Sequence, residues 1–432
     1  SPHPPTAIRS LPLLPRHHQQ QSQLLSPPSF RTTTARYASL SSNDDADDDD
    51  DDDSDSTSTS GSSGNSSMSE VSDNDPMSDE QQEAYWIQRT LREAIFGKVR
   101  LAVVLRRRPK NINPPPPSNA NNAVEGECIP EVEWEVIPGK YCAVKEMSLR
   151  RINENRGRMQ ENPLTEISIM QFIARGGVDG VEQVVDPERF MVEKKVLIPV
   201  NVWADNRNLY SILPYANGGE LFDHLDTHEK FTEPEARYWM RQILCGLGYL
   251  QKVGICHRDI SLENLIVHNG TCIIMDYGMS LRVPYLDPTT GRTDARADPT
   301  TNQRLLITPQ GTCGKWSYMS PEIMKNEEPF DGYAVDMWAA GVILFVMLTG
   351  FPPWDRPCRT DDRFRYMTGG LLVELLTQWN CGLSADAMDL LQNMLWFHRE
   401  NRLTLERVIG HPWVVNGDVT PPDGIQQEQP YV

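Results

Sequence analysis

Asp259, Asn264 and Asp276 carry side-chain oxygens at a spacing that suits the chemistry of phosphoryl transfer. Asn264 follows Asp259 by five residues, and Asp276 follows Asn264 by twelve. Transfer of a phosphoryl group from a nucleotide needs a carboxylate to orient the attacking hydroxyl group, and oxygen ligands for the magnesium ion that bridges the phosphates. We expect Asp259 to orient the hydroxyl group, and Asn264 together with Asp276 to bind magnesium.

The residues between Asn264 and Asp276 predict a β-hairpin. Two apolar runs, 265–267 and 272–275, are joined by a short polar segment that contains the Asn-Gly pair at Asn269. An Asn-Gly pair between apolar runs is a strong turn signal. Such a hairpin would bring Asn264 and Asp276 close together at one end.

Hydrophobic periodicity indicates the other elements that must position the chemistry. Residues 134–147 are typical of a strand, and 163–174 have apolar positions at helical spacing. Residues 196–202 and 209–213 predict two further strands. The helix expected over 235–251 opens with a capping box that starts at Thr232.

The complete string 255–278 resembles the catalytic loop and the magnesium loop of eukaryotic protein kinases of the serine/threonine type. A His-Arg-Asp triplet such as the one ending at Asp259 would be weak support alone, so the resemblance rests on the whole string and its spacing. It covers about residues 84–414, and His411-Pro412-Trp413 places it nearest the calcium/calmodulin-dependent kinase group. It implies an α+β fold with two lobes: a small five-stranded antiparallel sheet with one main helix, and a larger, mainly helical lobe.

The resemblance also implies which residues bind ATP. Lys145 matches the strand lysine that contacts the nucleotide phosphates, and Glu166 matches the helix glutamate that pairs with that lysine. A lone lysine or helix acid is usually a solvated surface residue, but these two stand in register with the later motifs. The other residues expected at the nucleotide are Gly97, Val99, Ala143, Leu213, Tyr215, Ala216, Glu220, Ile266 and Asp276.

The segment 91–99 departs from the family pattern. It aligns without a gap to the glycine-rich loop, yet only Gly97 is retained, and Arg92 and Ala94 stand where the other glycines would be. Glycine lets backbone amides approach phosphate without a side-chain clash. The departure favours a second interpretation, a pseudokinase scaffold that binds partners with weak or no catalysis.

Ser261 and Lys315 depart from the pattern in opposite senses. In most serine/threonine kinases a lysine at the first of these places contacts the transferred phosphate, and a threonine follows the Cys-Gly step at the second. The lysine and the hydroxyl have therefore exchanged places, and we expect Lys315 to bring its ammonium group beside Asp259 with Ser261 as its partner. Two independent losses are the alternative.

The end of the activation segment carries two more expectations. Glu322 and Arg402 should form the buried ion pair that the resemblance implies. Thr312 or Thr308 should be phosphorylated, with Arg258 as the receptor, because a guanidinium group binds phosphate bidentately.

The activity implied is transfer of the γ-phosphoryl group of ATP to serine or threonine hydroxyl groups of proteins. A tyrosine-specific enzyme is disfavoured because the Ala-Ala-Arg signature after Asp259 is absent. A small-molecule phosphotransferase is disfavoured by the protein-substrate elements around Glu322. Glu220 and Glu263 match acids that in some kinases bind an arginine upstream of the target residue, which predicts substrates with basic residues there.

The net charge of -19 is concentrated in one tail: residues 44–83 contain sixteen acids and no lysine or arginine. We expect residues 1–83 to be disordered, with the acidic run at 44–55, because like charges repel and little is apolar. The kinase domain is expected at 84–414, with insertions near 106–130 and 284–310, and a short tail at 415–432. A basic stripe is missing, so nucleic-acid binding is not expected.

The eight cysteines are scattered without a CxxC pair, which indicates a reducing compartment, the cytoplasm or the nucleus. Residues 1–43 lack acids and contain four arginines, as an organelle transit peptide would, but their proline content favours disorder. The longest apolar run, 338–348, is too short to span a bilayer and predicts a buried core helix instead of a membrane contact.

Overall fold

The computed structural model describes residues 23–25, 83–109, 132–177, 184–291, 293–294 and 303–423. The expectations for most of the N-terminal tail, for most of the first insertion and for parts of the second insertion and the C-terminal tail concern residues outside these ranges. The disorder expected at 23–25 is wrong, because these residues form a short strand that pairs with residues 85–87. The chain divides into two compact units. The described residues of the larger unit are Arg89–Leu101 and those from Tyr141 onward, and the smaller unit holds those of Ser22–Gln88 and Ala102–Lys140.

The smaller unit consists, in its described part, of strand residues. They belong to β1 (Gln23–Leu25), β2 (Glu83–Ala94), β3 (Gly97–Pro109) and β4 (Val132–Ser148). β1 pairs antiparallel with β2, with Leu24 opposite Trp86. Tyr85 and Ile87 are buried on either side of the exposed Trp86, which is the alternation expected of a strand with one buried face. Lys140 and Glu83 form an ion pair at 2.9 Å.

The strands are hydrogen-bonded in the order β1-β2-β3-β4-β6-β5. β5 (Asn201–Ala204) and β6 (Asn208–Pro214) belong to the larger unit, and β6 pairs antiparallel with β4. This register places Lys145 opposite Ser211 and Ala143 opposite Leu213. The nucleotide residues expected on two separate segments therefore stand on neighbouring strands.

The strand expected over 196–202 is wrong for most of its length. The strand begins only at Asn201, and Val196 forms an isolated parallel bridge with Ile274. Residues 196–198 are buried in the hydrophobic core, so their apolar character reflects burial of an irregular segment. A short apolar run cannot distinguish these cases by its pattern alone.

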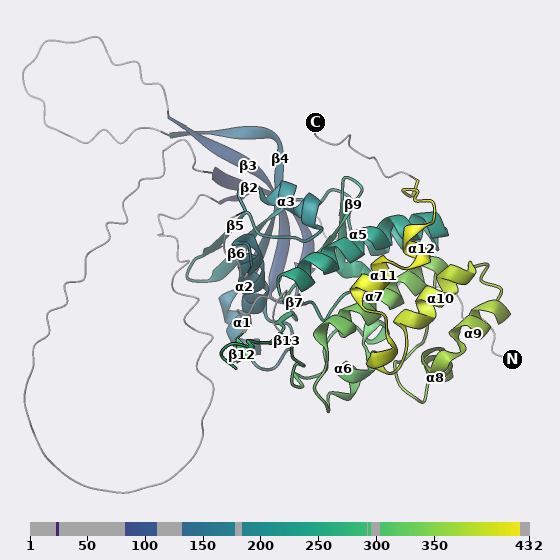
Figure 1. The fold of residues 1–432 in the computed structure, drawn as a ribbon. Coiled ribbons are helices and arrows are strands. Elements are labelled where there is room, and N and C mark those ends of the chain that lie inside the picture. Colours follow the sequence, from purple (N-terminus) through teal and green to yellow (C-terminus); the bar gives the residue numbers. More distant parts are fainter. Residues whose placement is uncertain are drawn as a thin grey trace, which may run out of the picture. The chain divides into compact units, whose positions relative to one another are not determined.

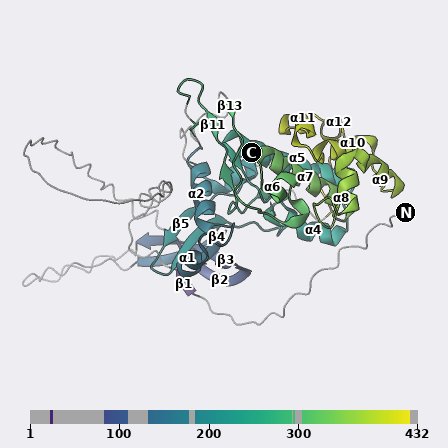
Figure 2. The ribbon, with the colours of Figure 1, turned by 90° about the horizontal axis from the view of Figure 1, so that it is seen from below.

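Two helices accompany the sheet, α1 (Leu149–Asn155) and α2 (Pro163–Ala174), whereas α3 (Pro187–Lys194) contacts α5 (Glu233–Lys252) and β9 (Thr271–Ile274). α2 has the bounds predicted from the sequence. Asn162 caps it by accepting a hydrogen bond from the Leu164 N–H group at 3.0 Å, and Pro163 occupies the first helical position, where its missing N–H costs nothing. α1 and α2 lie beside β5 and β6 (Figures 1 and 2), and Met170 and Ile173 of α2 are buried in the core.

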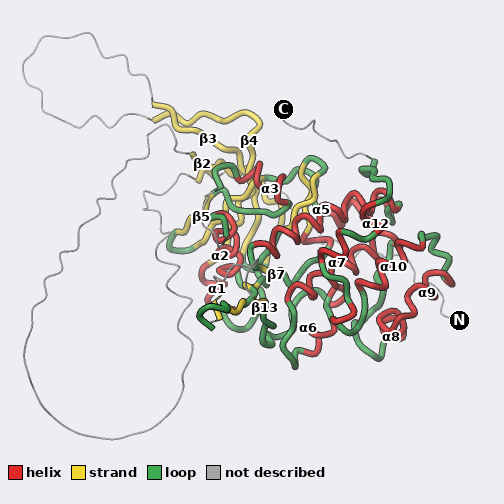
Figure 3. The backbone as a smooth tube through the Cα atoms, in the orientation of Figure 1, coloured by secondary structure: helices red, strands yellow, loops and turns green. Residues whose placement is uncertain are grey.

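The elements from α4 onward form the second lobe of the fold. This lobe is mainly helical, as Figure 3 shows. Its helices are α4 (Leu221–His228), α5 (Glu233–Lys252), α6 (Pro321–Lys325), α7 (Gly332–Thr349), α8 (Asp362–Tyr366), α9 (Leu372–Gln378), α10 (Ala385–Met394), α11 (Leu405–Ile409) and α12 (Pro412–Val415). Its short strands are β7 (Ile255–Cys256), β8 (Leu265–His268), β9 (Thr271–Ile274), β10 (Leu281–Arg282), β11 (Tyr285–Leu286), β12 (Thr293–Asp294) and β13 (Gln303–Arg304). The two-lobed α+β fold predicted from the sequence is thereby confirmed, but the expected number of five strands in the sheet is wrong, because the three-residue strand β1 adds a sixth.

α5 and α7 form the centre of this lobe (Figure 1). The capping box at the start of α5 is present, with the Thr232 N–H group donating to the Glu235 carboxylate at 2.8 Å. α7 is long and apolar enough to pass a test for a membrane span, but 94% of that stretch is buried within the protein. It is the core helix that the apolar run 338–348 predicts.

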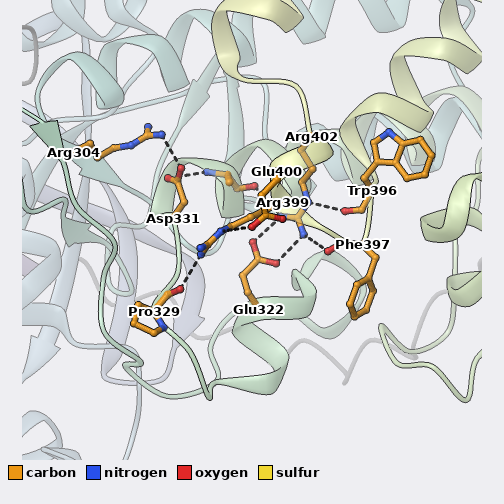
Figure 4. A network of polar contacts seen from close by, with 10 residues as sticks. Arg304, Glu322, Pro329, Asp331, Trp396, Phe397, Arg399, Glu400 and Arg402 are labelled. Carbon is orange, nitrogen blue, oxygen red and sulfur yellow. Dashed lines mark hydrogen bonds and ion pairs between the residues drawn. The ribbon is translucent and has the colours of Figure 1, made fainter.

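α6 is joined to the loop before α11 by the predicted ion pair of Glu322 and Arg402 (Figure 4). The two Arg402 terminal nitrogens donate to the two Glu322 carboxylate oxygens at 2.6 and 2.8 Å. Arg402 also donates to the Trp396 carbonyl at 2.8 Å and lies over the Trp338 ring at 4.6 Å. Its side chain is 1% exposed, so every donor must be satisfied within the protein.

Candidate active site

The predicted hairpin positions the metal-ligand candidates. β8 and β9 pair antiparallel from Leu265↔Ile274 to His268↔Thr271. The turn uses positive φ angles of 48° at Asn269 and 75° at Gly270, which these two residue types tolerate. At the open end, the Met275 N–H group donates a hydrogen bond to the Asn264 carbonyl at 3.0 Å. This hydrogen bond holds Asn264 next to the residue that precedes Asp276.

Asn264 orients the carboxylate of Asp259. Its side-chain nitrogen donates to the Asp259 backbone carbonyl at 2.7 Å and to Oδ2 at 2.9 Å. Because the nitrogen is engaged, the carbonyl oxygen of the Asn264 amide is left to bind a metal. The second Asp259 oxygen, Oδ1, is buried and accepts no hydrogen bond from the described residues. An oriented carboxylate with one free oxygen suits an incoming hydroxyl group.

Two residues of this region have left-handed backbone conformations. Arg258 has φ 67° and Asp276 has φ 68°, which is uncommon for residues other than glycine. The Asp336 carboxylate holds the first by accepting hydrogen bonds from the His257 and Arg258 N–H groups, both at 2.7 Å. Such conformations persist where the surrounding structure enforces them, and they are frequent at functional sites.

His257 is a fixed, neutral support of the loop. Burial lowers the pKa of His257 to about 4. Its Nε2 lies 3.0 Å from the Met275 carbonyl, and its Nδ1 accepts the Asp259 N–H group at 3.3 Å. A neutral ring that donates from Nε2 and accepts at Nδ1 satisfies both contacts, so this histidine links the catalytic loop to the end of the hairpin.

Lys145 and Glu166 form the predicted pair. The Lys145 ammonium lies 2.7 and 2.5 Å from the two Glu166 oxygens, and the side chains are 13% and 5% exposed. Burial alone would lower the pKa of Lys145, but the carboxylates of Glu166 and Asp276 outweigh it and raise the pKa. Lys145 is therefore a fixed positive charge between Glu166 and Asp276, as phosphate binding requires.

Lys315 reaches the catalytic loop. Its ammonium donates to the Ser261 hydroxyl at 2.7 Å and pairs with the Glu263 carboxylate at 3.1 Å. Burial raises the pKa of Asp259 to about 6, and the charge of Lys315 acts against that rise. The contact with Ser261 is the one expected from the exchanged positions, whereas the pairing with Glu263 was not foreseen. An action of Lys315 on a phosphate stays a prediction.

The segment aligned with the glycine-rich loop is a tight connection between β2 and β3. A Cβ atom on Gly97 would lie 1.8 Å from the Glu146 carbonyl oxygen, so glycine is required there by strand packing. Phe96 is buried, with 4% exposure. Arg92, which replaces the first glycine, forms an ion pair with Glu220 at the start of α4. The structure thus gives Gly97 a packing role and engages Glu220 with a cation of this chain.

The remaining nucleotide candidates are partly accessible or line the adjacent core. Ala143 and Ile266 are half-buried against the hydrophobic core, and Leu213 is buried opposite Ala143. Ile266 forms an isolated antiparallel bridge with Glu220. Three more residues expected at the nucleotide, Val99, Tyr215 and Ala216, are also half-buried.

Two residues before α2 belong to this site and carry no sequence signal. The Cγ atom of Glu161 would lie 2.8 Å from a Cβ atom on Gly278, and its carboxylate interacts electrostatically with Asp276 and Lys145. Gln160 lies against Gly311 of the activation segment in the same way, at 2.3 Å from a hypothetical Cβ atom. The path of the loop 156–162 places both side chains, and no motif encodes that path.

Together these groups suit a magnesium-bound triphosphate. Carboxylate and amide oxygens are the ligands that magnesium prefers, and Asp276 and Asn264 supply them. The buried, unpartnered Asp259 oxygen and the charged Lys145 are the groups that a hydroxyl nucleophile and phosphate oxygens would engage.

Comparisons with known proteins agree with this geometry. The family model described as protein kinase domain matches residues 135–414. The chain is 31% identical over 256 residues to the Mus musculus "Serine/threonine-protein kinase DCLK3", a match that covers 57% of this chain and 29% of that protein. It is 32% identical over 248 residues to the Saccharomyces cerevisiae "Probable serine/threonine-protein kinase HSL1", covering 56% and 14%.

A third relative is matched over more of its own length. The chain is 27% identical over 279 residues to the Arabidopsis thaliana "Serine/threonine-protein kinase SRK2G", covering 63% of this chain and 73% of that protein. The chain therefore spans less than a third of the first two relatives and about three quarters of the third.

Proposed function

Because the chain belongs to the protein kinase family, we propose that it transfers the γ-phosphoryl group of ATP to serine or threonine hydroxyl groups of proteins. The observation that carries the proposal is the carboxylate of Asp259. One of its oxygens is fixed by Asn264, and the other is buried and accepts no hydrogen bond from the described residues. A free carboxylate oxygen beside two metal-ligand candidates is what an attacking hydroxyl group needs.

The residues divide the work by position. Asp259 Oδ1 would accept the hydrogen bond of the substrate hydroxyl group and direct its oxygen toward the γ-phosphorus atom. Lys145, held by Glu166, would bind the α- and β-phosphate oxygens, and Lys315 would place a second ammonium group beside the transferred phosphate. Asn264 and Asp276 would hold magnesium, which supplies positive charge to the triphosphate when it is bound.

The substrate preference that we propose is for proteins with basic residues upstream of the target hydroxyl group. Its support is two acids near the catalytic loop: Glu220, which precedes α4, and Glu263, which directly precedes Asn264. Each acid is already paired with a cation of this chain, Arg92 and Lys315 respectively. A basic residue of the substrate must compete with these cations, so we expect the preference to be modest.

Two broader proposals concern the enzyme's relatives and its compartment. The triplet His411-Pro412-Trp413 supports a place nearest the calcium/calmodulin-dependent kinase group, and the Trp413 indole is held by Glu233 at 2.8 Å. Six described cysteines, at positions 245, 256, 272, 313, 358 and 381, are free thiols, which supports action in a reducing compartment, the cytoplasm or the nucleus.

An ATP-consumption and peptide-phosphorylation assay tests the activity. The wild type should consume ATP in the presence of a serine peptide, and Asp259→Asn and Asp276→Asn should each lower kcat by roughly a hundredfold or more. Asp226→Asn, a matched change on the exposed face of α4, should leave kcat within about twofold. Binding of magnesium nucleotide without turnover by the wild type would instead identify a pseudokinase scaffold.

A further inference from the structure

Gly311 of the activation segment, which we define as residues 276–322, is held from two sides. Its N–H group donates to the Asn326 side-chain oxygen at 2.8 Å. On its other side the carboxamide of Gln160 lies so close that a Cβ atom on Gly311 would be 2.3 Å from the Gln160 nitrogen. Gly311 has φ 89°, a conformation that glycine adopts freely.

The two partners of Gly311 come from different lobes. Gln160 lies in the loop that leads into α2, the helix that carries Glu166. Asn326 ends α6 in a left-handed conformation with φ 49°, and its N–H group donates to the Glu322 carbonyl at 3.0 Å. Gly311 thus connects the loop before α2 to the end of α6, and we call the three residues Gln160, Gly311 and Asn326 the clamp.

A parallel contact joins the same loop to the magnesium loop. The Asn162 N–H group donates to the Gly278 carbonyl at 3.0 Å, and Glu161 packs on Gly278. Farther along the segment, Ile307 and Phe330 exchange two backbone hydrogen bonds at 2.8 and 2.9 Å. The described part of the activation segment is therefore held by backbone hydrogen bonds near both ends, in addition to the ion pairs of Arg304 with Asp331 and of Lys315 with Glu263.

The two terminal nitrogens of the Arg258 guanidinium group are already engaged, whereas its Nε is buried and has no hydrogen-bond partner among the described residues. The group donates to the Cys313 sulfur at 2.8 Å and to the Met279 carbonyl at 3.3 Å, and it lies 5.6 Å from the centre of the Phe330 ring. Arg258 is 7% exposed. A phosphate on the exposed Thr308 or Thr312 would have to displace these contacts before it could bind this arginine.

We propose that the clamp holds the activation segment in its catalytic arrangement without phosphorylation, with Gln160 and Asn326 as positioning residues. The clamp contacts Gly311, and the residues that follow Gly311 in the chain contact the catalytic loop. Gly314 lies against the catalytic loop, where a Cβ atom would be 3.3 Å from Asp259 Oδ1, and Lys315 follows it with its bond to Ser261. The inference rests on the proposed kinase function and specifies how that activity is controlled.

The test uses the full chain after phosphatase treatment, with mass spectrometry to verify that residues 276–322 carry no phosphate. The dephosphorylated protein, Thr308→Ala and Thr312→Ala should each retain kcat/KM within about twofold of the untreated wild type. Gln160→Ala removes a side chain that is exposed but packs closely on Gly311, and it should lower kcat by roughly three- to tenfold with little change in the KM for ATP. Met159→Ala, in the same loop and 37% exposed, is the matched control.

Asn326 offers a pair of variants that separates positioning from folding. Asn326→Gly keeps the left-handed backbone but removes the acceptor and should lower kcat as Gln160→Ala does. Asn326→Asp retains the acceptor oxygen and should therefore keep kcat at the wild-type level. Equal activity of the two variants, or loss of activity on phosphatase treatment that rephosphorylation restores, would overturn the proposal.

Hydrogen exchange distinguishes failure of the clamp from failure of the proposed function. In the unphosphorylated protein, peptides that cover 305–318 should be protected. That protection should fall in Gln160→Ala and Asn326→Gly but not in Met159→Ala. If the wild type phosphorylates nothing yet shows this pattern, the kinase assignment fails and the clamp stands. If exchange in 305–318 is the same in all variants, the clamp is wrong.

Discussion

At the scale of single residues, the two oxygens of Asp259 have different tasks. Oδ2 is held by Asn264, whereas Oδ1 accepts no hydrogen bond within the described part of the chain. Burial raises the pKa of this carboxyl group to about 6, and the positive charge of Lys315 opposes that rise. The ionised form is the one that accepts a hydroxyl proton, so activity is coupled to the charge of Lys315.

We expect kcat/KM to fall as the pH drops through about 6, because Asp259 then takes up a proton. Lys315→Met removes a charge that favours the ionised carboxylate, so it should raise the pKa of Asp259 and move this acid limb to higher pH. Lys315→Arg should leave the limb in place. The measurement is kcat/KM for a serine peptide between about pH 5 and 9.

In the Lys315→Met background, Ser261→Lys should return the acid limb of the pH profile to its wild-type position, because it places an ammonium group where Lys315 meets Ser261 in the wild type. Lys252→Met, at the end of α5, is the distant control. An acid limb that stays where it is in Lys315→Met would show that the two side chains are not coupled.

Residue types and spacing predicted the groups that act through local chain geometry. The contact of Lys315 with Ser261 follows from comparing two motifs, and the pairing of Asn264 with Asp259 lies within one loop. Glu161 and Gln160 could not be predicted, because their position depends on the path of an irregular loop. Glutamate and glutamine in such a loop look like ordinary surface residues.

At the scale of elements, the joint between α6 and the loop before α11 shows how a buried ion pair fixes two distant segments (Figure 4). Arg402 is almost fully buried, and Glu322 has 16% of its side chain exposed. Breaking such a pair leaves the remaining charge without compensation, which costs far more than the intact pair contributes.

Arg402→Met should lower the free energy of unfolding by about 3–5 kcal/mol, because Glu322 would remain buried without a partner. Urea denaturation followed by fluorescence measures this change. Arg399→Met is the control within the same network. Arg399 pairs with Glu400, which is 67% exposed, and the cost should be about 1 kcal/mol or less. Equal losses in the two variants would contradict the special role of Arg402.

A second ion pair between elements joins Arg92 of β2 to Glu220 at the start of α4. Arg92→Met should free Glu220 for a substrate arginine. The ratio of kcat/KM for peptides with and without an upstream arginine should then rise about three- to fivefold, as expected for a partly exposed pair. Arg150→Met removes an equally charged but remote residue, paired with Glu154 on α1, and should not change the ratio. A rise that is equal for both peptides would indicate an effect on ATP binding instead.

Elements with clear periodicity or capping signals were predicted well, and irregular ones were not. α2 begins and ends as predicted because Asn162 and Pro163 are a strong start signal. The run 196–202 failed because a buried irregular segment is as apolar as a buried strand. The strand β1 could not be predicted, since a three-residue strand has no periodicity of its own.

At the scale of the whole molecule, Asp336 connects the core helix α7 to the catalytic loop. Burial raises its pKa from the usual value of 3.8 to about 7. Between these values the folded protein binds a proton at Asp336 that the unfolded chain does not. The resulting stability is fully present below about pH 4 and is lost as the pH rises through about 7.

We expect Asp336→Asn to abolish this part of the pH dependence. In the wild type, Asp336 contributes as much as about 4 kcal/mol to the change in the free energy of unfolding between about pH 4 and 7. The free energies of unfolding of the two proteins should therefore change with different slopes over this pH range. Denaturant unfolding at a series of pH values measures the slopes. Asp226→Asn, on the exposed face of α4, should keep the wild-type slope, and identical slopes in all three proteins would refute the assignment.

Two arginines of α5 hold the chain that follows α12. Arg237, only 5% exposed, donates to the Trp413 and Asp418 carbonyls, and Arg241 donates to the Val414 carbonyl at 2.8 Å. A recombinant fragment trimmed to residue 414, where the family match ends, would deprive both guanidinium groups of an acceptor, the Asp418 carbonyl for Arg237 and the Val415 carbonyl for Arg241. The shortest fragment suited to crystallisation or screening therefore ends beyond Asp418.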